Sequence, residues 1–474
     1  MPTMTSKLAP ALVAAAVFVA AFVLYWPSLD DFFALDDFIW IKEATNPSAT
    51  DYFRRAFTFP PAGYFEPQTP FWRPLIDVYF YAAWRVFGEE PVAYHVVNVV
   101  LHGAIATLLA TLVWQLTSSW LKGFLAALLF AVLPTYDIAV TWISSATELF
   151  AAFFYLLMLV LFGASLRGGA RRSVRYGAAA GALLFALLSK ESAISAPAAL
   201  AGLTAVLAPP RSTRDVVARA RDLAPFVALA AAYFLFLYVQ EYRASLDGGS
   251  YQFGWHARTH LWDYLKWLTL PVPDDRASWV AGARPYAASA FLILGVASIA
   301  LRNWRAAFCF GWTLAALLPY SFFTAGIELR YTYLASIPFS AFLVVFVSDA
   351  VARLPLRLSS RAAIAGTALV LVLAVPLAME TRDRQDALRV QGEAYRQVYE
   401  EVPALCGDLP PDGHIYMIYD PAFDLYNTST RMALNLTYVR ANVYRTAPAD
   451  LVAFTPNVCV VDYIDGRFVL VDRH

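Results

Sequence analysis

The chain has 474 residues, of which 59% are hydrophobic, 15% aromatic and only 15% charged, and its formal net charge is +0. A soluble domain carries about 25% charged residues, so most of this chain must face lipid or other buried helices. The balanced charge argues against a nucleic-acid binder, which needs a basic surface.

Apolar runs recur along the chain, each about long enough to cross the ~30 Å hydrocarbon core of a bilayer. Hydropathy predicts about eleven transmembrane helices, and so an all-α polytopic membrane domain over residues 1–379. The predicted spans are residues 8–26, 93–116, 119–134, 141–166, 175–189, 192–208, 223–241, 285–302, 305–323, 331–350 and 361–379.

Arginines crowd four of the connecting loops, and with these spans all four loops fall on the same side as Lys7. The positive-inside rule makes that side cytoplasmic. An odd number of spans then puts the C-terminal tail and the loop after the first span outside. The alanine- and arginine-rich composition suggests a bacterium, so we expect an integral protein of the bacterial cytoplasmic membrane. The loop arginines are Arg167, Arg171, Arg172, Arg175, Arg211, Arg214, Arg219, Arg221, Arg302, Arg305, Arg353, Arg357 and Arg361.

Three segments are not predicted to span the membrane. Residues 27–92 are rich in proline and aromatic residues from Phe59 to Pro74 and contain an amphipathic run near 75–87. Such a composition suits short helices lying along the membrane surface. Residues 242–284 form an external loop with His256, His260 and several tryptophans.

The third segment, residues 380–474, is predicted to be a small extracytoplasmic α+β domain. A charged helix over 382–401 precedes strand-like runs at 414–419, 433–439 and 458–463, and Asp465-Gly466 is a good hairpin turn. Cys406 and Cys459 lie in this tail. They could pair if the tail faces an oxidising compartment, or remain two buried free thiols.

Short polar motifs follow one another in a characteristic order. They are Asp36-Asp37 after the first span, Trp72-Arg73-Pro74-Leu75, Tyr94-His95 with Asn98 and His102, Leu133-Pro134 followed by Thr141-Trp142-Ile143-Ser144, Leu188-Ser189-Lys190-Glu191, and Glu328-Leu329-Arg330-Tyr331 with Tyr333. Over residues 8–350 this order resembles the integral-membrane GT-C glycosyltransferases. The resemblance is strongest to the protein O-mannosyltransferases and the transmembrane, tetratricopeptide-carrying O-mannosyltransferases. The tail shows no tetratricopeptide repeats, so acceptor identity is not carried over.

The resemblance implies a sugar donor carried on a polyprenyl phosphate and an acceptor hydroxyl or amine. It also implies a loop aspartate as general base and inversion at the anomeric carbon. It assigns the base to Asp36. Asp37 would orient the acceptor or tune Asp36, because neighbouring carboxylates disfavour joint ionisation. The alternative is that both carboxylates solvate or cap a helix end. Asp30-Asp31 is interpreted as a solvated loop start.

The leaving lipid phosphate needs cations to stabilise its growing charge. Lys190 and Arg330 are the candidates, and each stands near an acid, Glu191 and Glu328 respectively. Arg73 could face the phosphate or the sugar, and Tyr331 could hold the neck of the prenyl phosphate. The alternative for these cations is an interfacial role, with the charged head snorkelling to the headgroup layer.

Glu148 lies within an apolar span, where a carboxylate must face the bundle interior and have a partner. A structural pairing is the favoured interpretation. His102 shares a helix face with His95 and Asn98, and an interhelical hydrogen bond is favoured for it over a ligand role. No strong metal-ligand cluster occurs, so no cofactor is predicted, although a divalent metal remains open.

The predicted function is therefore an inverting glycosyltransferase at the outer face of the cytoplasmic membrane. It would move a sugar from a polyprenyl-phosphate donor to a protein, glycan or lipid. The alternative is a polytopic transporter or lipid flippase. Against this alternative, the sequence has no internal repeat and its charged motifs gather at one predicted membrane face.

Overall fold

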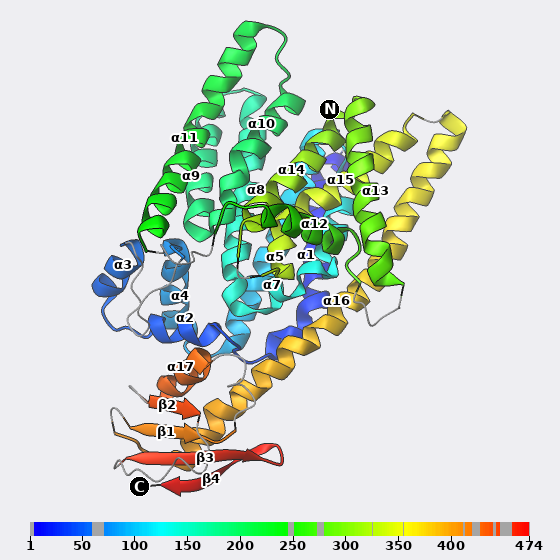
Figure 1. The fold of residues 1–474 in the computed structure, drawn as a ribbon. Helices are drawn as coiled ribbons and strands as arrows, with labels where there is room; N and C mark the ends of the chain where they lie inside the picture. The colour runs from blue at the N-terminus through cyan, green and yellow to red at the C-terminus, as the bar shows by residue number, and fades with distance from the viewer. Residues whose placement is uncertain are drawn as a thin grey trace.

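The computed structural model describes residues 4–58, 71–244, 251–272, 279–324, 326–353, 355–410, 413–419, 427–438, 442–445 and 457–473. Eleven of its helices form a tall bundle, and a small sheet lies beyond one end of that bundle (Figure 1). Each of the eleven falls on one of the apolar runs. They are α1 (Met4–Tyr25), α5 (Pro91–Thr117), α6 (Trp120–Ala131), α8 (Ala146–Leu166), α9 (Arg172–Ser189), α10 (Ala196–Leu207), α11 (Thr213–Ala244), α13 (Val280–Ala300), α14 (Trp304–Ser321), α15 (Tyr333–Val351) and α16 (Leu356–Cys406).

The predicted helical bundle is confirmed, but the count of eleven spans is not. Within the described residues, seven helices are long and apolar enough to cross a membrane. α6 and α10 have 12 residues each. At 1.5 Å per residue each is about 18 Å long, well short of the hydrocarbon core. The seven candidate spans are Leu8–Asp30, Pro91–Thr117, Ile143–Leu166, Thr213–Val239, Val280–Ala300, Leu329–Val351 and Ile364–Cys406.

Small residues allow the bundle helices to pack closely. A Cβ atom on Gly123 of α6 would lie 2.5 Å from the carbonyl oxygen of Ala110 on α5. This contact is possible only for glycine, as is common where helices associate without a hydrophobic driving force. The two helices bury Leu109, Val113 and Ala127 in the main core.

Short helices fill the connections between the long ones. The segment 27–92 contains three of them, as expected, and α4 covers the amphipathic run. These helices, α2, α3 and α4, lie between the bundle and the sheet (Figure 1). Residues 59–70 of the proline-rich stretch lie outside the described residues. The short elements are η1 (Trp26–Asp30), α2 (Asp37–Ala44), α3 (Ala49–Phe57), α4 (Pro74–Phe87), η2 (Pro134–Tyr136), α7 (Asp137–Thr141), η3 (Ile143–Ser145), η4 (Glu191–Ser195), α12 (His256–Thr269) and η5 (Leu329–Thr332).

The C-terminal part is a four-stranded sheet in the order β2-β1-β3-β4, with α17 (Asn427–Thr437) beside it. β1 is parallel to β2 and β3, and β3 and β4 form the predicted hairpin at Asp465-Gly466. Both turn residues have positive φ, 52° and 83°, as a two-residue hairpin turn requires. The strands are β1 (His414–Met417), β2 (Asn442–Arg445), β3 (Val458–Ile464) and β4 (Arg467–Arg473).

The predicted strand at 433–439 is wrong, because most of these residues belong to α17. Parallel neighbours such as β1 and β2 need a crossover connection, which is usually a helix. α17 supplies that crossover and buries Ala433 and Leu434. The alternation of apolar and polar residues over 433–439 therefore reflects one buried face of a helix rather than a strand.

α16 connects the bundle to the sheet and is 51 residues long. It runs without a break through residue 379, where the apolar region gives way to the charged one. Cys406 at its end forms a disulfide bond with Cys459 of β3, which resolves the alternative left open by the sequence. In the charged part of α16, a Cβ on Gly392 would lie 2.9 Å from the carbonyl oxygen of Phe32, so the helix touches the backbone four residues before Asp36.

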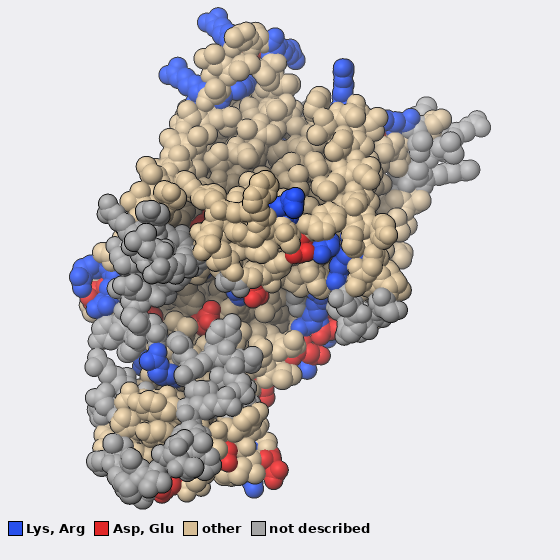
Figure 2. Space-filling view, viewed as in Figure 1, with Lys and Arg blue, Asp and Glu red and all other residues tan. Residues whose placement is uncertain are grey.

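Charge is distributed unevenly along the long axis. Figure 2 shows Lys and Arg side chains gathered at the end of the bundle farthest from the sheet, including the tip formed by α10 and α11. This end carries the loop arginines Arg211, Arg214 and Arg221, while Asp36 precedes α2 near the opposite end.

Candidate active site

Asp37 holds the segment that follows the first span. Residues 31–37, here called the acid loop, turn back so that Ala34 N donates to Asp37 Oδ2 at 2.9 Å. Ser144 N donates to Asp37 Oδ1 at 2.7 Å, and Ser144 Oγ donates to the same oxygen. Burial raises the pKa of Asp37 to about 7, against the hydrogen bonds from Ser144 and Ala34, which lower it. Because both oxygens are occupied by the protein, Asp37 positions the acid loop.

Asp36 is placed differently, although it is the adjacent residue. It is half-buried immediately before the first residue of α2, and its side chain makes no hydrogen bond with any described residue. Burial raises the pKa of Asp36, while the charges of Arg330 and Arg73 lower it. Its neighbour Leu35 has a φ of 55°, a left-handed conformation that is strained for a bulky residue. The bent loop thus places the Asp36 carboxylate within electrostatic range of two arginines.

Arg330 of η5 is the arginine that aromatic rings surround. Its guanidinium carbon lies 4.5 Å from the ring centre of Trp142 and 5.2 Å from that of Tyr331. It forms no ion pair within 4 Å with any residue that the structure describes. Trp142 in turn donates from its indole Nε1 to the carbonyl oxygen of Ala34 at 3.0 Å. One side chain therefore touches both the acid loop and Arg330.

Lys190 is engaged inside the bundle. Its ammonium group donates to Glu148 Oε1, and the side chains of the two residues are only 4% and 3% exposed. Tyr320 donates to the other Glu148 oxygen at 3.1 Å and stacks on Tyr331 at 4.7 Å. The ammonium also lies 5.0 Å from the centre of the Tyr331 ring. Glu148 thus has the partner that a carboxylate inside an apolar bundle needs.

Arg73 makes a forked ion pair with Glu191. Its Nε donates to Glu191 Oε2 at 3.2 Å and its Nη2 to Oε1 at 2.9 Å. The hydroxyl of Tyr251 donates to Glu191 Oε1 at 2.9 Å. Arg73 immediately precedes Pro74 and α4, so this bidentate pair fixes the start of α4 against η4.

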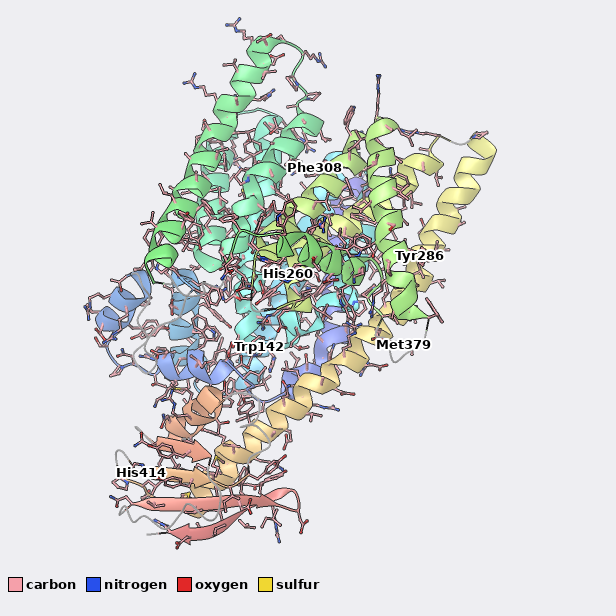
Figure 3. The ribbon with its side chains drawn as sticks, viewed as in Figure 1. Trp142, His260, Tyr286, Phe308, Met379 and His414 are labelled. Atoms are coloured by element: carbon pink, nitrogen blue, oxygen red, sulfur yellow. A yellow bond between two sulfur atoms is a disulfide. The ribbon has the colours of Figure 1, made fainter. Side chains whose placement is uncertain are left out.

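The structure therefore brings together six of the charged residues singled out in the sequence, from five separate elements. These are Asp36, Arg73, Glu148, Lys190, Glu191 and Arg330. Trp142, labelled in Figure 3, marks their level near the sheet end of the bundle. Glu328 is exposed. His102 is buried away from this group, with its ring nitrogens 2.8 Å from the Tyr333 hydroxyl and 3.2 Å from the Ala131 carbonyl.

One correction concerns a residue of the acid loop. Asp31 is not a solvated loop start, because only 3% of it is exposed. The contributions of Ser144, Tyr251 and Tyr320 were not predicted. The Trp142-Ile143-Ser144 motif could have indicated the role of Ser144. Tyr251 and Tyr320 could not be singled out, because tyrosines are common at membrane interfaces. The described residues contain no group of three or more His, Cys, Asp or Glu side chains suited to a metal ion.

Comparisons with known proteins find short sequence matches and a shared fold. No family model matches the chain. Over 91 residues it is 33% identical to the mouse protein O-mannosyl-transferase TMTC2, covering 19% of this chain and 11% of the relative. Over 139 residues it is 36% identical to Drosophila melanogaster Tmtc1, covering 29% of this chain and 16% of the relative. The matched segments thus span less than a fifth of these relatives.

Two solved structures share the fold across nearly the whole chain. ArnT from Cupriavidus metallidurans in the apo state has a TM-score of 0.57 at 14% identity, covering 92% of this chain and 86% of that one. The Archaeoglobus fulgidus oligosaccharyltransferase AglB, solved with an inhibitory peptide and a dolichol-phosphate, has a TM-score of 0.53 at 12% identity, covering 93% and 65%. The chain therefore shares its fold with ArnT and with this oligosaccharyltransferase, in agreement with the fold that the resemblance implied.

Proposed function

We propose that this protein is an inverting glycosyltransferase that moves a sugar from a polyprenyl-phosphate-linked donor to an acceptor at the outer face of the cytoplasmic membrane. Asp36 acts as the general base on the acceptor, and Arg330 stabilises the phosphate that leaves. The fold of ArnT and AglB supports a transferase, and AglB was solved with a dolichol-phosphate. The acceptor is a protein, a glycan or a lipid.

The observation that carries this proposal is that some charged side chains of the group are paired within the protein while two others are not. Lys190 and Arg73 are each bound to a carboxylate, and Asp37 is bound to Ser144 and Ala34. Asp36 and Arg330 are left without an ion pair among the described residues, yet they interact electrostatically. A base and a cation that do not pair with each other are both available to the substrates. The base takes the acceptor proton, and the cation meets the charge developing on the phosphate.

The outer-face location is supported by two features at opposite ends of the molecule. The end near α10 and α11 is rich in arginine, as expected of a cytoplasmic face (Figure 2). The other end carries the disulfide bond between Cys406 and Cys459, which persists in an oxidising compartment. The charged group lies toward the disulfide end rather than at mid-depth, which favours a surface transferase over a transporter with a midplane site.

The test is a transfer assay with purified full-length protein and a panel of prenyl-phosphate sugars, with and without a chelator. Mass spectrometry of the products identifies the sugar and the acceptor class. We expect the donor to be consumed with release of free prenyl phosphate, and this release to depend on Asp36. A protein that binds no prenyl-phosphate sugar and releases no prenyl phosphate would contradict the proposal.

A further inference from the structure

A polar cavity lies outside the charged group of the candidate active site. It has a volume of about 340 Å³ and opens between η1 and the charged part of α16. Its lining carries three carboxylates and two guanidinium groups, in addition to a serine and an amide. The lining residues are Pro27, Ser28, Asp31, Arg382, Asp383, Gln385, Asp386 and Arg389.

Two side chains in this lining are buried with unused hydrogen-bonding atoms. Asp31 is 3% exposed and its Oδ2 has no hydrogen-bond partner. Gln385 is 4% exposed; its amide nitrogen donates to the carbonyl of Leu24 at 3.3 Å, but its Oε1 has no partner. A buried polar atom without a partner costs free energy. Both unused atoms are acceptors, so the missing partner is a donor.

The two arginines of the cavity indicate that the ligand also carries an anionic group. Arg389 pairs with Asp386 at 2.7 Å, but their side chains are 57% and 64% exposed. Such an exposed pair contributes little and exchanges partners easily. Arg382 also lines the cavity. A ligand that carries both a hydrogen-bond-donating ammonium and a phosphate would satisfy the buried acceptors and the arginines together.

The cavity lies at the level where the first span and α16, which form its two walls, change from apolar to charged side chains. On the first span, exposed Val19, Val23 and Trp26 precede the lining residue Pro27. On α16, exposed Val375 and Met379 (labelled in Figure 3) precede Arg382. Figure 2 shows charges of both signs on α16 next to its apolar part. Exposed apolar side chains on one side and charges on the other define the headgroup level of a bilayer.

We propose that this cavity binds the headgroup of a zwitterionic phospholipid with a primary ammonium, as in phosphatidylethanolamine. The ammonium donates to Asp31 and Gln385, the phosphate faces Arg382 and Arg389, and the acyl chains lie against the apolar side chains of α1 and α16. A choline headgroup has no N–H to donate, and a glycerol headgroup has no positive charge. The cavity should therefore prefer ethanolamine to both.

The test is lipid retention by the full-length protein, which needs no sugar donor and is independent of the transferase assay. Protein is incubated with equal amounts of phosphatidylethanolamine, phosphatidylcholine and phosphatidylglycerol, and bound lipid is counted by native mass spectrometry. We expect wild type to retain phosphatidylethanolamine preferentially. Asp31→Asn should weaken retention at least about tenfold, the loss expected for one hydrogen bond between charged groups.

Arg389→Gln, a change at an exposed side chain that should leave the fold intact, should also weaken retention. Glu400→Gln is the matched control, because it removes one exposed charge from α16 outside the cavity. Equal retention of the three lipids overturns the proposal, as does unchanged phosphatidylethanolamine binding in both cavity variants. Binding of soluble glycerophosphoethanolamine without retention of the lipid would also overturn it, because the site would then serve a soluble amine.

Discussion

The indole of Trp142 lies 4.5 Å beneath the guanidinium group of Arg330. Through its Nε1 it also holds the carbonyl of Ala34, two residues before Asp36. The relative position of Asp36 and Arg330 therefore depends on one aromatic side chain that comes from neither of their elements. Catalysis by separated groups requires such fixed geometry. The predictions below ask what each group contributes.

Replacing Asp36 with Asn should reduce transfer by about 10²–10⁴-fold, the range for loss of a general base. Folding should be unaffected, because the Asp36 side chain makes no hydrogen bond to the described residues. The measurement is initial rate with a prenyl-phosphate sugar, alongside gel filtration. Asp30→Asn is the control, since Asp30 is exposed. Full activity in the Asp36 variant would remove the base assignment.

Replacing Arg330 with Gln should slow transfer by about 10²–10³-fold, as for loss of a donor that stabilises developing negative charge. It should also change the pH profile. The charge of Arg330 lowers the pKa of Asp36, so without it that pKa rises and less of the base is ionised at a given pH. The acid limb of kcat/KM should therefore move to higher pH.

Arg330→Lys keeps the positive charge, so the acid limb of the kcat/KM profile should stay close to its wild-type pH. Arg54→Gln, at a side chain that is 68% exposed, should leave rate and profile unchanged. An Arg330→Gln enzyme with the wild-type acid limb would show that this arginine does not act on Asp36.

Replacing Lys190 with Met should destabilise the bundle, because it leaves Glu148 buried without its cation. Breaking a buried pair from one side costs about 3–5 kcal/mol. The double variant Lys190→Met with Glu148→Gln should recover much of the lost thermal stability. Melting curves of the three proteins in detergent measure this. A single variant that melts like wild type but binds donor poorly would instead make Lys190 a phosphate ligand.

Removing the disulfide bond should loosen the C-terminal sheet from α16. The two cysteines are 53 residues apart, and chain-entropy arithmetic for a loop of that size gives about 4 kcal/mol. The variant Cys406→Ala with Cys459→Ala should be cleaved sooner by protease in the tail. In unfolded wild type without reductant, thiol labelling should mark Cys309 alone. Labelling of all three cysteines would contradict the pairing.

The sequence was sufficient for the helical bundle because long apolar runs have few other structures available in lipid. It also identified the charged residues that the bundle brings together, since carboxylates and cations near membrane faces are few. It could not say which of them pair with each other. Lys190 and Arg330 look alike as sequence neighbours of acids, yet only Lys190 is neutralised, by Glu148, which lies 42 positions away. That difference arises from helix packing.

The C-terminal part shows the opposite limitation. The Asp465-Gly466 hairpin could be predicted because its turn is local, whereas residues 433–439 could not be assigned correctly. Their periodicity suits either a strand or one face of a helix over so short a window. The partners that decide between the two, β1 and β2, pair only through the tertiary fold.

α16 is a single long helix that connects the bundle to the C-terminal sheet. At 1.5 Å per residue its 51 residues extend about 75 Å. The helix is fastened to β3 by a covalent bond at one end and pressed against the backbone of Phe32 at Gly392. The sheet and the acid loop that carries Asp36 should consequently move together as one rigid unit. Spin labels on β4 and α2 should keep a single narrow distance distribution, with or without acceptor.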